Sequence, residues 1–220
     1  MKGNLVDNLS MIAANPTTLL TLGGVILLVI ALLRMKKVTF NARMMAHIGL
    51  ALALAVILHT LKLYHMPQGG SITLGGMIPI LLIAFFYGPE AGFLTGFLFG
   101  VINLIQDPYI LHPVQVLFDY PLPFMALGLA GYFKDRYLVG TVVAIIGRFI
   151  FHYISGIVFF ASYAPSGVSP YLYSLLFNAS YLSVECIVCV VIMRMLPVER
   201  IEMTIRRQAQ RSHNFKDNKI

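Results

Sequence analysis

The chain alternates between long apolar runs and short polar segments. Seven runs approach the ~20 apolar residues that a helix needs to cross a bilayer, and they cover residues 17–33, 44–63, 72–86, 91–105, 114–133, 138–161 and 171–195. None of these runs shows the strict alternation of polar and apolar positions that is typical of a membrane β-barrel strand. The pattern therefore predicts an all-α integral membrane protein with about seven transmembrane helices.

The composition argues against a soluble fold. Hydrophobic residues make up 58% of the 220 residues and charged residues only 11%, whereas soluble domains carry roughly 25% charged residues. One soluble core of this size cannot enclose so much apolar surface, but lipid can solvate the outside of each helix. The net charge of +7 does not indicate nucleic-acid binding, because the charges lie between and after the apolar runs.

Basic residues predict the orientation in the membrane. They cluster between the first two runs, between the fifth and sixth runs, and after the seventh: Arg34, Lys36, Lys37, Arg43, Lys134, Arg136, Arg200, Arg206, Arg207, Arg211, Lys216 and Lys219. Cytoplasmic loops carry an excess of Lys and Arg, so we expect a cytoplasmic C-terminus and an outer N-terminus. The first basic cluster follows the first apolar run, which argues against a cleaved signal peptide.

The outer loops that this topology leaves are the chemically varied ones. They comprise residues 65–71, 106–113 and 162–170, which are rich in Gly, Pro, His, Tyr and amide side chains. The cytoplasmic connections are short. Any binding chemistry is therefore predicted to face outward. Between the third and fourth runs, residues 88–90 (GPE) predict a tight turn.

Three of the predicted helices carry rows of polar residues at helical spacing, and each such residue is costly in hydrocarbon. The rows are Gln115 and Asp119, then Arg148 and His152, then Ser174, Asn178, Tyr181 and Glu185. Together they predict a central polar cavity that opens toward the outer loops. The alternative is that these residues only pair with one another, as Asp119 with Arg148 or Arg148 with Glu185, and hold the bundle together.

Four segments carry a family resemblance: residues 66–71 (MPQGGS), 112–120 (HPVQVLFDY), 148–156 (RFIFHYISG) and 173–181 (YSLLFNASY). In order and spacing they resemble the thiamine-specific S component of energy-coupling factor (ECF) transporters. The resemblance implies a six-helix S-component bundle over residues 41–196, with one extra N-terminal transmembrane helix within 1–40 and a basic cytoplasmic tail over 197–220. It also implies a substrate-binding membrane subunit without catalysis of its own, in the plasma membrane of a prokaryote.

Transferred onto this sequence, the resemblance assigns ligand-binding roles to Asp119, Tyr120, His152, Phe160, Tyr173 and Asn178. Some family members have tryptophan where Phe160 and Gly70 stand, and this chain has no tryptophan. Others have glutamate at the position of Asp119, so the carboxylate here reaches less far by one methylene.

The chemistry of thiamine fits these residue types. Its permanently cationic thiazolium needs a carboxylate in a low-dielectric pocket, for which Asp119 is the candidate, and its flat rings can stack on Tyr120, Phe160 and Tyr173. An amide such as Asn178 offers both a donor and an acceptor. Tyr173 and Asn178 are five residues apart, so we expect them to share a face only if Tyr173 lies outside the regular helix.

Two further residues complete the predicted site. Gln115 shares the helix face of Asp119, and Gln68 with its two following glycines is expected to form a lid, since glycine permits close backbone approach to a ligand. His152 could instead satisfy a buried partner such as Asp119.

Partner docking is expected on the second predicted helix. Gly49 and Ala53 are small residues four apart, a spacing that lets helices approach closely, and the resemblance implies an ECF T subunit and two cytoplasmic ATPase subunits as partners. The repeat of Gly92, Gly96 and Gly100 is expected to pack inside the bundle instead.

Two alternative functions stay open. The first is an S component for a different vitamin or a thiamine precursor, and the second is an intramembrane enzyme that uses His112, Asp119 and His152. A nucleotide-driven pump acting alone is excluded, because the chain has no G-x-x-x-x-G-K-[ST] loop. Cys186 and Cys189 lack the second pair that a zinc site needs, so no metal or cofactor is expected beyond thiamine as transported ligand.

Overall fold

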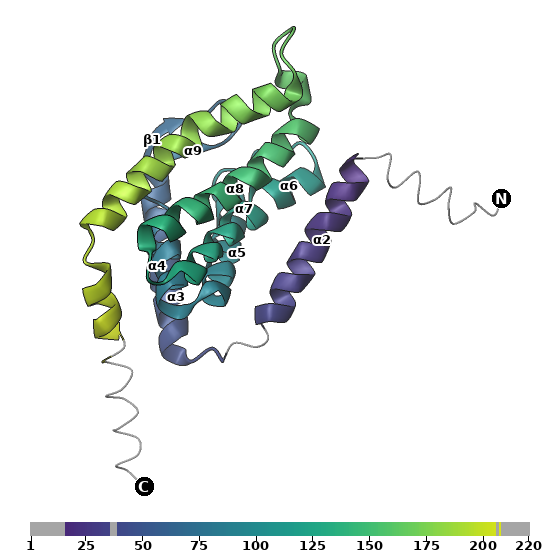
Figure 1. The fold of residues 1–220 in the computed structure, drawn as a ribbon. Helices are drawn as coiled ribbons and strands as arrows, with labels where there is room; N and C mark the ends of the chain where they lie inside the picture. Colours follow the sequence, from purple (N-terminus) through teal and green to yellow (C-terminus); the bar gives the residue numbers. More distant parts are fainter. Residues whose placement is uncertain (1–15, 36–38, 206, 208–220) are drawn as a thin grey trace, which may run out of the picture.

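The computed structural model describes residues 16–35, 39–205 and 207. Figure 1 shows a bundle of helices that carries one short β-hairpin. Its elements are α2 (Pro16–Met35), α3 (Ala42–Thr60), β1 (Lys62–His65), β2 (Ser71–Thr73), α4 (Ile78–Tyr87), α5 (Pro89–Gln106), α6 (Pro113–Asp119), α7 (Pro121–Met125), the 3-10 helix η1 (Ala126–Phe133), α8 (Tyr137–Phe159), the 3-10 turn η2 (Ala161–Tyr163) and α9 (Pro170–Met195). Lys36, Lys37, Arg206, Arg211, Lys216 and Lys219, which entered the orientation argument, lie outside the described residues.

Long apolar helices dominate the described part of the chain. Four segments are long and apolar enough to cross a membrane: Ala42–Thr60, Pro113–Phe133, Tyr137–Phe159 and Pro170–Met195. The apolar stretch Pro16–Ile30 of α2 and helix α4 (Ile78–Tyr87) are shorter. Gly88, with φ of 99°, forms the tight turn that was predicted between the third and fourth runs. The all-α membrane architecture expected from the sequence is confirmed.

The β-hairpin corrects the sequence-based prediction. Residues 62–63 and 72–73 were expected at the ends of the second and third helices, but β1 and β2 pair antiparallel, with Tyr64 opposite Ile72. Gly69 and Gly70 adopt φ values of 84° and 87° in the turn, and the Met66 N–H donates to the Gly70 carbonyl oxygen at 2.9 Å. Short apolar runs of this kind do not distinguish strand from helix by periodicity.

The fifth predicted helix is also interrupted. It consists of α6, α7 and η1 in succession, and the break falls at Tyr120, whose φ and ψ are −118° and −77°. Pro121 explains the break, because proline lacks a backbone N–H and disfavours the helical conformation of the residue before it. Asp119 and Tyr120 therefore lie at the end of a short helix.

The glycine stripe of α5 packs inside the bundle, as expected. A Cβ atom on Gly96 would collide with the backbone carbonyl of Phe124, and one on Gly100 with that of Tyr120. Gly92 is equally crowded. This close approach brings α5 against α7 and η1 and fixes one wall of the bundle.

Helix α2 lies along the side of the bundle, against α5 and α6 (Figure 1). Leu20 packs onto a buried cluster that includes Phe118 and Leu122. Gly24 faces α6, where a Cβ atom would lie 2.8 Å from Cδ2 of Leu117. Helix α2 thus covers the outer face of the short helix that carries Asp119.

Candidate functional site

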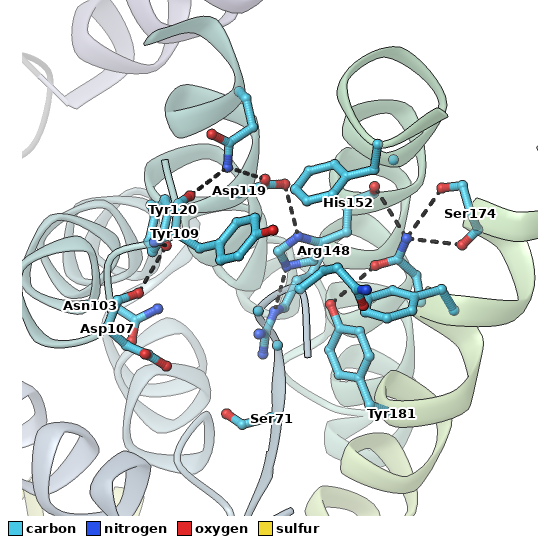
Figure 2. Close-up of a pocket in the computed structure, with 18 of the residues that line it drawn as sticks. Ser71, Asn103, Asp107, Tyr109, Asp119, Tyr120, Arg148, His152, Ser174 and Tyr181 are labelled. Carbon is cyan, nitrogen blue, oxygen red and sulfur yellow. Dashed lines mark hydrogen bonds and ion pairs between the residues drawn. The ribbon is translucent and has the colours of Figure 1, made fainter. Parts of the chain in front are cut away.

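One cavity opens between the β-hairpin, the loop after α5, and helices α6, α8 and α9 (Figure 2). All eight residues that were predicted to bind the ligand line it: Gln68, Gln115, Asp119, Tyr120, His152, Phe160, Tyr173 and Asn178. They come from four separate regions of the chain. The fold therefore brings the eight predicted residues together around one cavity. That they bind a ligand there is still a prediction.

Gln115 holds the carboxylate of Asp119 rather than standing free in the cavity. Its Nε2 donates to Oδ2 of Asp119 at 2.6 Å and to the Tyr109 carbonyl oxygen at 3.0 Å. Its Oε1 accepts from the Leu111 N–H at 3.0 Å. With 1% of its surface exposed, the amide has used its hydrogen-bonding groups on the protein, so Gln115 positions its neighbour on α6.

The charged side chains that line the cavity differ in their ion-pair partners. Arg148 Nη1 lies 3.9 Å from Oε2 of Glu185, which is one of the two ion pairs considered from sequence. His152 Nδ1 lies 3.5 Å from Oδ1 of Asp119 (Figure 2). Within the described residues Asp119 forms no ion pair with Lys or Arg. It is thus a carboxylate on the cavity wall without a fixed cationic side chain.

Aromatic side chains line the cavity beside the loop after α5. The Tyr120 hydroxyl donates to the Asp107 carbonyl oxygen at 2.9 Å and accepts from the Tyr109 N–H at 2.6 Å, which fixes the loop after α5. The ring of Phe160 stacks on that of Tyr109, with centroids 5.9 Å apart and planes at 21°. The hydrogen bond between the Tyr109 and Tyr163 hydroxyls, 2.9 Å long, raises the pKa of Tyr109 to about 12.

Helix α9 forms the opposite wall. Asn178 Nδ2 donates to the Ser174 carbonyl oxygen at 2.9 Å and to that of His152 at 3.3 Å, while its Oδ1 accepts from the Tyr181 hydroxyl at 3.2 Å. Tyr173 lies inside the regular helix, which begins at Pro170, and still lines the cavity with Asn178. The expectation that Tyr173 must lie outside the helix was therefore wrong, because a broad face of α9 borders the cavity.

Sequence reasoning did not assign several residues that line the same cavity. They include His59 at the end of α3, Asn103 on α5, and Asp107 and Tyr109 in the following loop. His59 and Asn103 are polar residues inside apolar helices, so the criterion that selected Asp119 could have found them. The carboxylate of Asp107 pairs with the ammonium of Lys62 on β1, which ties the hairpin to the loop after α5.

The structure does not assemble the residues proposed for an enzyme. His112 caps α6, where its Nδ1 accepts from the Val114 N–H at 3.1 Å, and its ring stacks on Phe159. It does not belong to the lining of the cavity that holds Asp119 and His152. Over the described ranges, no group of three His, Cys, Asp or Glu side chains could hold a metal ion.

The predicted docking residues lie on the outside of the bundle. Gly49 and Ala53 are both exposed on α3, and a Cβ atom on Gly49 would have no described atom within 4 Å. The neighbouring side chains on this face, Met45, Leu50, Leu54 and Ile57, are exposed and apolar. This face is available to lipid or to another helix.

A multi-pass helical bundle whose polar side chains converge on an internal cavity defines a membrane protein that binds a small molecule. The family described as "Thiamine transporter protein (Thia_YuaJ)" matches residues 45–205. The chain belongs to this thiamine transporter family, a family of transport proteins rather than enzymes. The matched region contains every cavity-lining residue and begins after α2.

Individual relatives agree with this assignment. The chain is 39% identical over 168 residues to "Thiamine transporter ThiT" of Bacillus subtilis (strain 168), covering 68% of this chain and 87% of that protein. It is 26% identical over 141 residues to "Thiamine transporter ThiT" of Lacticaseibacillus paracasei, covering 55% and 70%. The solved structure of ThiT from Listeria monocytogenes shares the fold, with a TM-score of 0.65 at 24% identity, over 73% of this chain and 96% of that one.

Proposed function

We propose that this protein is the substrate-binding subunit of an ECF-type transporter, which captures thiamine from outside the cell. The observation that carries the proposal is Asp119, a carboxylate on the cavity wall with no Lys or Arg partner among the described residues. A permanently cationic ring would supply the missing positive charge. Membership of the thiamine transporter family supports the same ligand.

The surrounding side chains suit the rest of the ligand. The rings of Tyr120, Phe160 and Tyr173 line the cavity and offer faces for stacking and cation–π contact, worth ~0.5–2 kcal/mol each. Asn178 offers an amide to the aminopyrimidine. To bind it, the amide would either exchange its present hydrogen bonds to Ser174 and Tyr181 for bonds to the ligand or form both at once. Gln68 and the two following glycines form the turn of the hairpin above the cavity.

The orientation and the partners complete the proposal. The positive-inside bias assigns the start of α3 and the segment after α9 to the cytoplasm, and Figure 1 draws both at the same end of the bundle. The cavity would then open outward and the ATPase subunits would act below it. We assign the exposed pair Gly49 and Ala53 to the T subunit, because small residues four apart allow close helix packing. The proposal also includes the domain limits. The S-component bundle spans residues 41–196, the basic cytoplasmic tail spans 197–220, and α2 is an addition to the bundle.

A titration with two ligands tests it. Purified protein in detergent is titrated with thiamine and with an analogue whose thiazolium is replaced by an uncharged thiophene ring, followed by heat or tyrosine fluorescence. We expect Asp119→Asn to weaken thiamine binding by about 10–100-fold, the loss expected for a hydrogen-bonded charged group, and to leave the neutral analogue little changed. Asn178→Ala should weaken both ligands.

The matched control is Asp135→Asn, the same chemical change at an exposed position outside this cavity. Equal affinity of the wild-type protein for both ligands would contradict the assignment of Asp119 to the cation. Folded protein that binds neither ligand would contradict thiamine as the substrate.

A further inference from the structure

The β-hairpin is fastened to helix α9 by a buried carboxylate. The backbone N–H and the hydroxyl of Thr73 both donate to Oε1 of Glu185, the hydroxyl at 2.8 Å. Thr73 is 1% exposed and Glu185 is 2% exposed. Hydrogen bonds to an ionised acceptor are roughly twice as strong as neutral ones. This contact therefore links the strand that follows the Gly69–Gly70 turn to the cavity wall.

Arg148 on α8 connects this carboxylate to the cavity. Its Nη1 lies 3.9 Å from Oε2 of Glu185, and its guanidinium lies 4.3 Å above the ring of Phe124. Its side chain is 4% exposed. A charge buried this deeply is tolerated when its counter-charge is present, and removal of one partner leaves the other uncompensated. Arg148 thus depends on Glu185, and Glu185 on Arg148.

Arg148 in turn sets the proton position of His152. Its Nε donates to Nε2 of His152 at 3.3 Å. A guanidinium has no acceptor atom, so Nε2 must carry a lone pair, and the proton of the neutral ring resides on Nδ1. That nitrogen faces Oδ1 of Asp119 at 3.5 Å. The imidazole therefore presents a donor to the carboxylate because of the contact on its other side.

The geometry points to a coupling device: Glu185 and Arg148 hold the hairpin closed over the cavity and transmit its position to Asp119. The inference rests on the proposed function, in which Asp119 binds the cationic ring of the ligand. A hairpin that lifts takes both Thr73 donors from Glu185, which frees this carboxylate to move relative to Arg148 and so loosens the orientation of His152. Coupling of this kind is reciprocal, so a ligand that favours the present arrangement at Asp119 also favours the closed hairpin.

Two substitutions separate the anchor from the charge pair. Thr73→Val removes the hydroxyl donor and keeps Glu185 with Arg148, whereas Thr73→Ser keeps the hydroxyl and serves as the conservative rescue. Glu185→Gln removes the negative charge. Glu90→Gln makes the same chemical change at the start of α5, where the residue does not line the cavity.

The first readout is hydrogen exchange of the hairpin, residues 62–73, measured by mass spectrometry on the full chain without ligand. We expect exchange about tenfold faster in Thr73→Val and at least as fast in Glu185→Gln, as befits a lost hydrogen bond to a charged acceptor. Thr73→Ser and Glu90→Gln should match the wild type. Thiamine should slow this exchange in the wild type, and less in the two anchor variants.

The second readout is thiamine kinetics by stopped-flow tyrosine fluorescence. Dissociation should accelerate by about the same tenfold in Thr73→Val, with association changed less than about twofold, because interface changes act mainly on dissociation. Faster hairpin exchange with wild-type dissociation overturns the coupling, and unchanged exchange overturns the anchor. If the wild type binds no thiamine, the proposed function fails by itself, and the exchange rates still decide the anchor.

Discussion

Gln115 and Asp119 lie one helical turn apart on α6 and share a hydrogen bond of 2.6 Å between Nε2 and Oδ2. The same amide accepts from the Leu111 N–H and donates to the Tyr109 carbonyl oxygen, so one side chain joins the loop before α6 to this short helix. The carboxylate is thereby held on the cavity wall before any ligand arrives. Preorganisation of this kind reduces the cost of binding.

We expect Gln115→Leu to weaken thiamine binding by about tenfold, because the carboxylate loses a donor and two backbone groups lose their partner. The effect should be smaller than that of Asp119→Asn, which removes the charge itself. Titration by heat in detergent measures both, with Ser180→Ala on the exposed face of α9 as the control. Wild-type affinity in Gln115→Leu would mean that Asp119 needs no positioning partner.

The glycine stripe of α5 should be intolerant of a single added methyl group. A Cβ atom on Gly100 would collide with the Tyr120 carbonyl, so Gly100→Ala should lower the free energy of unfolding by about 1–3 kcal/mol, as overpacking does. The control is Gly23→Ala on α2, where no described atom lies within 4 Å and alanine favours a helix by up to ~1 kcal/mol. Thermal unfolding in detergent compares the two, and equal midpoints would refute the close packing of α5.

Many of the residues that line the cavity could be predicted from the sequence, because they form rows of polar residues in apolar helices. Asp119 and His152 each stand in an apolar run, where a polar side chain is costly and therefore informative. The same criterion would have selected His59 and Asn103, which line the cavity from helices that were treated as plain spans. The local pattern at these positions thus indicated which residues line the cavity.

The hairpin and its anchor were not accessible in this way. The strands are four and three residues long, and their apolar residues continue the neighbouring helical runs without a change of composition. Thr73 and Glu185 are 112 positions apart, so no local spacing relates them. The break at Tyr120 was more predictable, since Pro121 follows it directly.

The packing of helix α2 against α6 should require a residue without a side chain at Gly24. Gly24 faces Leu117, so Gly24→Leu should push the two helices apart and lower the free energy of unfolding by about 1–3 kcal/mol. Gly23→Leu places the same side chain where no described atom lies within 4 Å and should not lower stability, since leucine, like alanine, favours a helix over glycine. Thermal unfolding in lipid nanodiscs is the measurement. If both variants match the wild type, α2 does not contribute to the stability of the bundle.

The exposed face of α3 should separate partner assembly from ligand binding. Gly49→Leu and Ala53→Leu add bulk to a face that contacts no described part of the bundle, so thiamine affinity should stay within about twofold of the wild type. Assembly with the T subunit and the ATPases should be lost, because close packing through small residues tolerates no large side chain. Gly49→Ala keeps the residue small and should assemble normally. Co-purification from cells that express all four chains, together with titration of each variant, decides the matter: retained assembly in both leucine variants would move the docking surface away from α3.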